Sequence, residues 1–296
     1  MKQPVIYGEV LFDRFPDGSA VLGGAPFNVA WHLQGFGLQP LFISRVGVDE
    51  AGDAVLDAMK AWGMDTRGLQ RDPEHPTGAV EVSLHEGQPR FEILPAQAYD
   101  YIDGSAVPAA DGASLIYYGT LASRSLVSRD GLETVRRKIP APGFVDVNLR
   151  PPWWTVELVE HALREARWAK LNIDELNILV GREVDRDSLV DAARLLCRDH
   201  DLELVILTLG EEGAGVVGPG HDEFAQASPV MNIVDTVGAG DAFSAVTILG
   251  LARDWPPEML LQRALHFAAR ICEQRGATAR DPGLYRSSLE AWNNEP

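Results

Sequence analysis

Apolar positions along the chain fall into two alternating kinds of segment. Short, continuous apolar runs have the length of strands, and such runs are typical of strands covered on both faces. Between them, apolar residues recur at the spacing of helices. This alternation predicts parallel strands joined by helical crossovers, so we expect an α/β fold with a three-layer, doubly wound, mostly parallel sheet. The predicted strands are 5–8, 41–47, 114–119, 143–148 and 202–210, and the predicted helices include 51–62, 155–168, 187–200, 240–252 and 257–275.

One region has a different pattern. Residues 77–94 alternate apolar and polar positions about the sequence HEGQP at 85–89, which predicts an antiparallel hairpin with one solvated face. We expect inserted strands around 10–22 and 77–98 to form a small β-hairpin lid. Because no linker-like or low-complexity tract interrupts the chain, residues 1–296 are interpreted as a single domain that carries this lid.

Charge narrows the choice of partner. The chain has 26 Lys and Arg residues against 43 Asp and Glu residues, a formal net charge of -17, and its arginines are scattered, which disfavours nucleic-acid binding. It has no apolar run of membrane-spanning length and no apolar core of a signal peptide near its start, so we expect no membrane partner and a cytoplasmic location. The expected partner is a small molecule. An anionic partner would need local positive potential, for example from a helix N-terminus.

Candidate chemistry is concentrated in the sequence DTVGAGDAF at 235–243. It lies between the apolar run 229–234, which is read as a strand, and a helical pattern, so Gly238, Ala239 and Gly240 are predicted to form the turn between them. Small residues leave backbone N–H groups accessible at a helix start, which favours anion binding. Taken alone, an aspartate in this position is more typical of a helix cap.

Two comparisons within the sequence sharpen this hypothesis. The same Ala-Gly-Asp-Ala occurs at 51–54, but Asp49 and Glu50 precede it and would repel a phosphate, so that copy is assigned to capping. No lysine stands in a Gly-Lys-Ser/Thr context, and the glycine pattern at 238–243 lacks the third glycine of a dinucleotide-binding fingerprint. Phosphate chemistry at 235–243 would therefore be of another kind.

At this point the sequence resembles a known family. DTVGAGDAF is similar to the C-terminal signature of the ribokinase-like (PfkB) carbohydrate kinases, and residues 21–37 followed by 45–56 resemble their N-terminal signature. The segments 146–154, 170–175 and 207–214 also resemble family motifs in the expected order. Together with GGAPFNVA at 23–30, they are most similar to the fructokinase branch. The resemblance implies a ribokinase-like fold.

The resemblance also implies an activity, the ATP-dependent transfer of a phosphoryl group to a sugar alcohol. Asp241 would be the general base, with the N–H groups of Gly238, Ala239 and Gly240 around the transferring group. Fructose is the expected acceptor. A 2-keto-3-deoxy sugar acid, ribose or a nucleoside remain alternatives, and so does a catalytically silent sugar sensor or scaffold.

Residues for the acceptor are implied in the same way. Asp13 and Asn28 match positions that hold sugar hydroxyl groups, and Gly23 and Gly24 would let the backbone approach the ring. A tight turn and a helix cap are the structural alternatives for the two glycines and Asn28. Arg150 would offset negative charge near the transfer site, and Asp146 and Asn148 would line the same strand end.

The nucleotide and cation sites complete the picture. Asn172 and Glu175 match an element that organises Mg²⁺ around the nucleotide phosphates, with helix capping as the alternative. Asp235 is the candidate ligand of a monovalent cation such as K⁺. By analogy, the lid is also expected to form a homodimer. The residues expected to contact ATP are Asn172, Thr208, Gly210, Gly213, Gly238, Gly240 and Gly276.

Overall fold

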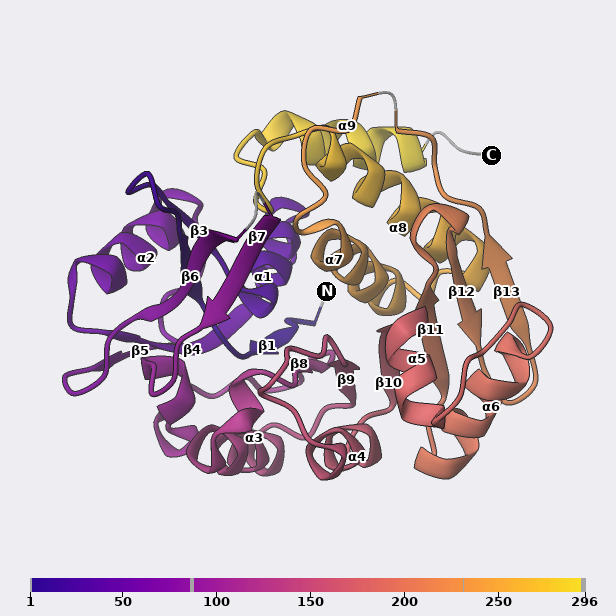
Figure 1. Ribbon diagram of the computed structural model, residues 1–296, viewed down its shortest axis with the longest axis horizontal. Coiled ribbons are helices and arrows are strands. Elements are labelled where there is room, and N and C mark those ends of the chain that lie inside the picture. The colour runs from indigo at the N-terminus through magenta and orange to yellow at the C-terminus, as the bar shows by residue number, and fades with distance from the viewer. Residues whose placement is uncertain (1, 86–87, 231, 294–296) are drawn as a thin grey trace.

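The computed structural model describes residues 2–85, 88–230 and 232–293. Its main sheet has nine strands, and the seven strands from β5 to β11 in its order run parallel. The predicted doubly wound sheet is confirmed (Figure 1). The strand order is β13 (Asp222–Ala225), β12 (Ala214–Val217), β11 (Leu204–Thr208), β10 (Trp168–Asn172), β9 (Gly143–Asp146), β8 (Ile116–Gly119), β1 (Val5–Tyr7), β4 (Leu41–Gly47) and β5 (Leu69–Asp72).

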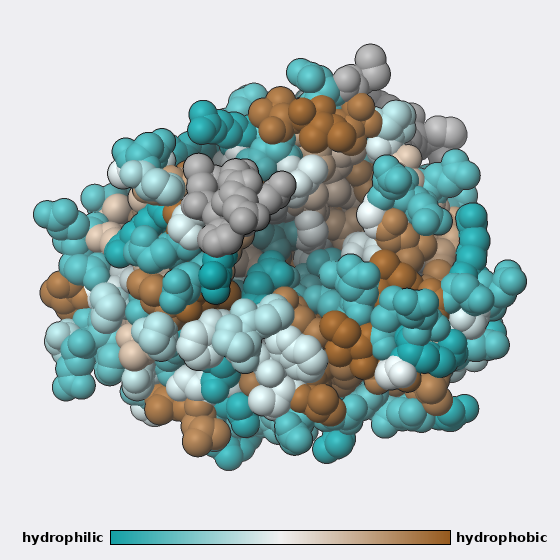
Figure 2. All heavy atoms as spheres, in the orientation of Figure 1, coloured by the Kyte–Doolittle hydropathy of each residue, from teal (hydrophilic) through white to brown (hydrophobic). Residues whose placement is uncertain are grey.

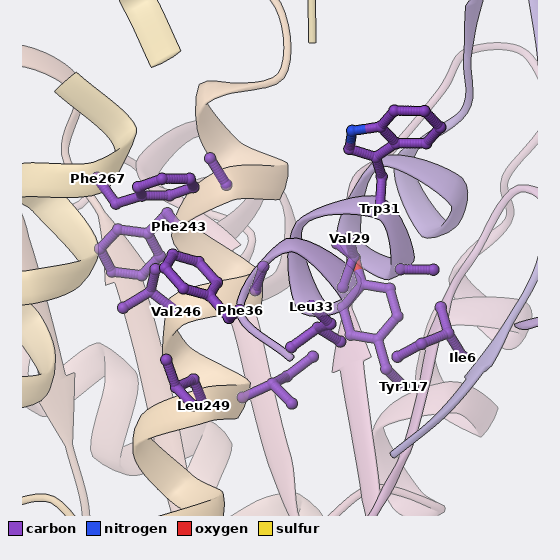
Figure 3. Close-up of a cluster of buried hydrophobic side chains, with 14 of the residues drawn as sticks. Ile6, Val29, Trp31, Leu33, Phe36, Tyr117, Phe243, Val246, Leu249 and Phe267 are labelled. Atoms are coloured by element: carbon purple, nitrogen blue, oxygen red, sulfur yellow. The ribbon is translucent and has the colours of Figure 1, made fainter. Parts of the chain in front are cut away.

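Helices cover both faces of this sheet, and each face has its own apolar core. Figure 3 shows the first core, where side chains of α1, α7 and α8 meet those of the central strands. It includes the aromatic rings of Phe36, Phe243 and Phe267. The helices of this face are α1 (Ala25–Gly35), α2 (Glu50–Ala61), α7 (Ala239–Ala252), α8 (Pro257–Cys272) and α9 (Pro282–Asn293); those of the other are α3 (Leu126–Lys138), α4 (Val156–Arg164), α5 (Ile173–Val180) and α6 (Leu189–His200).

The lid is a second, four-stranded sheet in the order β3 (Ala20–Gly23), β2 (Leu11–Arg14), β6 (Gly78–His85) and β7 (Gln88–Ile93). The predicted hairpin is confirmed as β6 paired with β7, although residues 86–87 of its turn lie outside the described residues. A small apolar cluster holds the inner face of the lid against the body. Its buried members are Leu11, Val80, Tyr99, Leu121 and Ala122.

One predicted element is absent from the described residues, and the end of another is wrong. The helix predicted over 155–168 ends at Arg164, because Trp168 already pairs in β10. The apolar run 229–234 contains no strand among its described residues, since the β12–β13 hairpin occupies that edge of the sheet. Ile233 and Val234 are more than half exposed. The run is a loop that lies against the end of α8, where the N–H of Val234 donates to the carbonyl oxygen of Cys272. No helix in the described part of the chain is both long and apolar enough to span a membrane.

Candidate active site

The site begins at the first turn of α7. Gly238 is the residue before the helix and has a φ of 81°. A Cβ there would lie 2.4 Å from Cβ of Ala277, so the backbone and its neighbour both require glycine. No side chain in the described part of the chain caps α7, whereas the carboxylate of Asp49 caps α2 by accepting a bond from the N–H of Gly52 at 2.7 Å. The first turn of α7 therefore keeps its positive end free of a capping side chain.

Asp241 lies within this turn and is not its cap. Its Oδ2 accepts a hydrogen bond of 2.8 Å from Nδ2 of Asn28, which belongs to the neighbouring helix α1. Burial raises the pKa of Asp241 to about 6, although the bond from Asn28 and the charge of Lys170 act in the opposite direction. A carboxyl group of this kind is ionised at neutral pH and basic enough to accept a proton from an alcohol.

Behind the glycine turn lies a buried ion pair that the sequence reasoning missed. Nζ of Lys170 donates to Oδ2 of Asp146 at 2.8 Å, and both side chains are less than a tenth exposed. The hydroxyl of Ser244 lies 2.8 Å from the same oxygen and 2.9 Å from the carbonyl oxygen of Gly240. A Cβ on Gly240 would lie 3.4 Å from Nζ of Lys170. In the sequence, the feature that could have revealed this ion pair is a lysine within an otherwise apolar strand.

The residues expected to hold the acceptor gather beside Asp241. Asp13 is on β2, Gly23 ends β3, and Asn28 lies in the first turns of α1. A Cβ on Gly23 would lie 3.9 Å from Oδ2 of Asp13 and 4.0 Å from Oδ1 of Asn28. That Oδ1 atom is buried and has no hydrogen-bond partner among the described residues. Gly24 has a φ of 106°, which a glycine adopts readily.

Arg150 is exposed and lies at the rim of this group. Burial raises the pKa of Asp13 and the charge of Arg150 lowers it, and the same guanidinium lowers the pKa of Asp241. One arginine therefore acts on two carboxyl groups of the predicted acceptor site. Figure 2 shows a hollow with hydrophilic residues around it near the centre of the same face of the molecule.

Asn172 and Glu175 form a reciprocal capping box at the start of α5. Oδ1 of Asn172 accepts from the N–H of Glu175, and Oε2 of Glu175 accepts from the N–H of Asn172, both at 2.9 Å. Oε1 of Glu175 accepts from the N–H of Leu149 at 2.8 Å. Asn172 and Glu175 therefore do cap α5, as the structural alternative expected. The described residues contain no group of three or more His, Cys, Asp or Glu side chains that could hold a metal, so the Mg²⁺ role stays a prediction.

The remaining nucleotide-site residues fall into two places. Thr208 ends β11 and is the direct sheet partner of Asn172. Gly210 and Gly213 follow Thr208. A Cβ on Gly213 would lie 2.0 Å from the carbonyl oxygen of Ala225, so close packing alone requires glycine at this position.

The second place lies beside the turn at Gly238. Oδ2 of Asp235 accepts a bond of 3.0 Å from the N–H of Gly276, and Oδ1 of Asp235 accepts a bond of 3.0 Å from the N–H of Val237. The carboxylate therefore ties the loop after α8 to the loop before α7. Its proposed role toward K⁺ stays a prediction.

An open α/β sheet with a carboxylate at an uncapped helix start, a buried lysine behind it and polar side chains beside a lid sheet is the arrangement expected of a phosphotransferase of the sugar-kinase class. The profile of the pfkB family of carbohydrate kinases matches residues 6–282. The chain belongs to this family.

Individual relatives agree with that assignment. The chain is 29% identical to the fructokinase of Escherichia coli over 93% of each chain. It is 30% identical to the aminoimidazole riboside kinase of Salmonella typhimurium over 87% of this chain and 82% of that protein. The structure of a fructokinase from Vibrio cholerae O395, with fructose, ADP and calcium bound, superposes with a TM-score of 0.81 at 26% identity and covers 97% of this chain and 98% of that one. The protein is thus a sugar kinase.

Proposed function

We propose that the protein is a fructokinase, which transfers the γ-phosphoryl group of ATP to a primary hydroxyl of fructose. The observation that carries the proposal is the group formed by Asp241, Asn28 and Asp13 at the uncapped start of α7. It combines a base with hydroxyl-binding side chains and free N–H groups, which phosphoryl transfer requires. The names of the relatives favour fructose as the acceptor.

The proton is handled by Asp241. In the proposed mechanism its carboxylate accepts the proton of the acceptor hydroxyl as the oxygen of that hydroxyl forms its bond to the γ-phosphorus and the bond to the leaving ADP oxygen breaks. Asn28 holds the carboxylate in place through the 2.8 Å bond. Gly23, Gly24 and Asp13 orient the sugar so that the reacting hydroxyl faces Asp241.

Negative charge on the transferring group is offset by the protein itself. In the first turn of α7 the N–H of Ala239 donates to the carbonyl oxygen of Thr236 at 3.3 Å, and no described side chain caps the turn, so the N–H of Gly240 is proposed to donate to the transferring group. The ammonium group of Lys170 lies directly behind Gly240, and Arg150 supplies a second positive charge at the rim. We infer that Gly276, Thr208, Gly210 and the other predicted glycines shape the adjoining nucleotide site.

Magnesium fits this site only in one way. Each oxygen of Glu175 already accepts one backbone bond, but a carboxylate oxygen has further lone pairs that can accept from water bound to the ion. We propose that Glu175 and Asn172 hold Mg²⁺ through such waters, and that the ion neutralises phosphate charge when bound. Asp235 is proposed to contribute to a K⁺ site beside the loop at Gly276.

A homodimer through the lid is proposed as well. Val21 and Phe91 lie on the face of the lid sheet that carries Asp13, as the strand register requires, and they are 42% and 56% exposed. Leu11 and Val80 of the same face pack against the body, so packing of the exposed part of this face on a second copy would cover Val21 and Phe91. Size-exclusion chromatography with light scattering should give a dimer, and Phe91→Glu should reduce it to a monomer.

The acceptor is tested by ADP release with Mg·ATP. The panel contains fructose, other hexoses, ribose, 2-keto-3-deoxygluconate and nucleosides. The proposal expects the highest kcat/KM with fructose. Faster turnover of a nucleoside would instead favour an activity like that of the aminoimidazole riboside kinase relative. Sugar binding without turnover of any member would favour the sensor alternative and refute the kinase.

A further inference from the structure

Glu9 is a buried carboxyl group to which the mechanism above gives no role. It lies between β1 and the first lid strand, β2, and the residue is 3% exposed. Its Oε2 atom has no hydrogen-bond partner among the described residues. An orphaned buried carboxyl oxygen costs folding free energy, so its retention calls for an explanation in a ligand or a bound water.

Its surroundings place Glu9 at the acceptor site. A Cβ on Gly24 would lie 2.8 Å from the carbonyl oxygen of Glu9, so the Gly23–Gly24 turn rests directly on its backbone. Burial raises the pKa of Glu9 to about 7, and the charge of Arg150 lowers it, as it lowers the pKa of Asp13 and Asp241. The charge of Arg150 therefore acts on all three carboxyl groups.

Other buried atoms nearby also lack partners in the described part of the chain. They are Oδ1 of Asn28, the hydroxyl of Tyr99 and Nη1 of Arg124. The charge of Arg124 lowers the pKa of Glu9, and the charge of Glu9 raises the pKa of Tyr99. The group thus offers donors and acceptors together, which suits hydroxyl groups because a hydroxyl both donates and accepts.

The charge balance of this group favours a neutral ligand. The guanidinium of Arg124 is already held by both oxygens of Asp100, with bonds of 2.7 and 2.8 Å. Its charge is therefore offset before any ligand binds. The guanidinium of Arg150 is set against the carboxyl groups of Glu9, Asp13 and Asp241, so a carboxylate on the acceptor would face more carboxyl groups than cations. The cluster is built for a polyol and not for a sugar acid.

We propose that Glu9 is an acceptor-binding residue, whose free Oε2 accepts a hydrogen bond from a hydroxyl of a neutral polyhydroxy acceptor other than the hydroxyl that is phosphorylated. The inference rests on the proposed sugar-kinase reaction and adds a specificity residue to it. The buried orphan is then the cost in stability of a binding site that is complete only with sugar.

The test uses Glu9→Met and Glu9→Gln in the full-length protein, with Glu92→Met on the exposed surface of the lid as the matched control. Glu9→Met should raise the Tm without ligand, because it removes an orphan carboxyl, and should raise KM for the acceptor about tenfold or more while leaving KM for ATP unchanged. Glu9→Gln, which retains an acceptor oxygen, should recover most of the acceptor affinity. The control should match wild type.

The outcomes separate this inference from the proposed function. If wild type turns over its preferred sugar and Glu9→Met keeps the same acceptor KM, Glu9 has no role in binding and the inference fails while the kinase stands. A lower ligand-free Tm in both Glu9 variants with unchanged KM also overturns the inference and points to a structural role. Preference of wild type for a sugar acid overturns the neutral-acceptor part. A wild type that phosphorylates no member of the panel refutes the kinase and this inference together.

Discussion

Replacing Asp241 by asparagine should abolish turnover and, at the same time, stabilise the protein. The residue is partly buried, and burial raises its pKa from 3.8 to about 6. In the folded state its charged form is therefore disfavoured relative to the unfolded chain. Asparagine removes the charge and keeps an oxygen that can accept the bond from Asn28, so the hydrogen bond of 2.8 Å has a counterpart in the variant.

The size of the effect follows from the same pKa values. Above pH 6 the wild-type carboxyl group is ionised in both states, so the full difference of about 2 units opposes folding, which corresponds to about 3 kcal/mol. As the pH falls through the folded pKa, the folded protein takes up a proton first and the penalty shrinks. Asp241→Asn should therefore raise the free energy of unfolding by about 3 kcal/mol at pH 8 and by about half as much at pH 5.

Urea unfolding of wild type and variant at pH 8 and pH 5 measures this directly. Asp57→Asn provides the control, because this exposed carboxyl group on α2 lies at the surface, 3.8 Å from the ammonium group of Lys60, and its change should stay within about 0.5 kcal/mol. A stability gain for Asp241→Asn that is absent, or that grows as the pH is lowered, would refute the argument that the folded site holds a disfavoured charge.

Three further predictions concern the same site. The acceptor kcat/KM should fall about tenfold per pH unit below pH 6, as protonation removes the base Asp241, and a pH profile that stays flat to pH 4.5 would contradict this. Gly238→Ala should lower both Tm and kcat, because its φ of 81° and the overlap with Ala277 resist a side chain, whereas Gly220→Ala in open space should leave kcat unchanged. Lys170→Met should cost about 3–5 kcal/mol in urea unfolding, since it strands a buried carboxylate, and equal stability would show that the pair is not coupled.

The sequence predicted the sheet and the lid because those signals are local. Continuous apolar runs and the alternation at 77–94 each report on the burial of a single segment, and the parallel sheet and the β6–β7 pair followed from them. The run at 229–234 shows the limit of this reasoning. Its composition is that of a strand, but β13 already occupies that edge of the sheet. Which segment pairs at the edge depends on the rest of the fold, so the residues of the run alone do not predict it.

The site was predicted in part for the same reason. Motifs identified Asp241 and Asn28, and the structure joins them by a hydrogen bond across 213 positions. Glu9 and Lys170 were missed, because a single carboxylate or lysine has no pattern of its own. Lys170 matters because it is buried and paired with Asp146. Glu9 matters because its Oε2 atom is buried without a partner among the described residues. Such information appears only when the chain is folded.

The central claim is that the chain phosphorylates a sugar with Asp241 as its base. The most direct measurement follows acceptor-dependent ADP release for wild type and Asp241→Asn, together with calorimetric binding of the preferred sugar to both. We predict turnover by wild type, a loss of at least about 100-fold in kcat for the variant, and sugar binding by both proteins. Turnover by Asp241→Asn at the wild-type rate would contradict the claim.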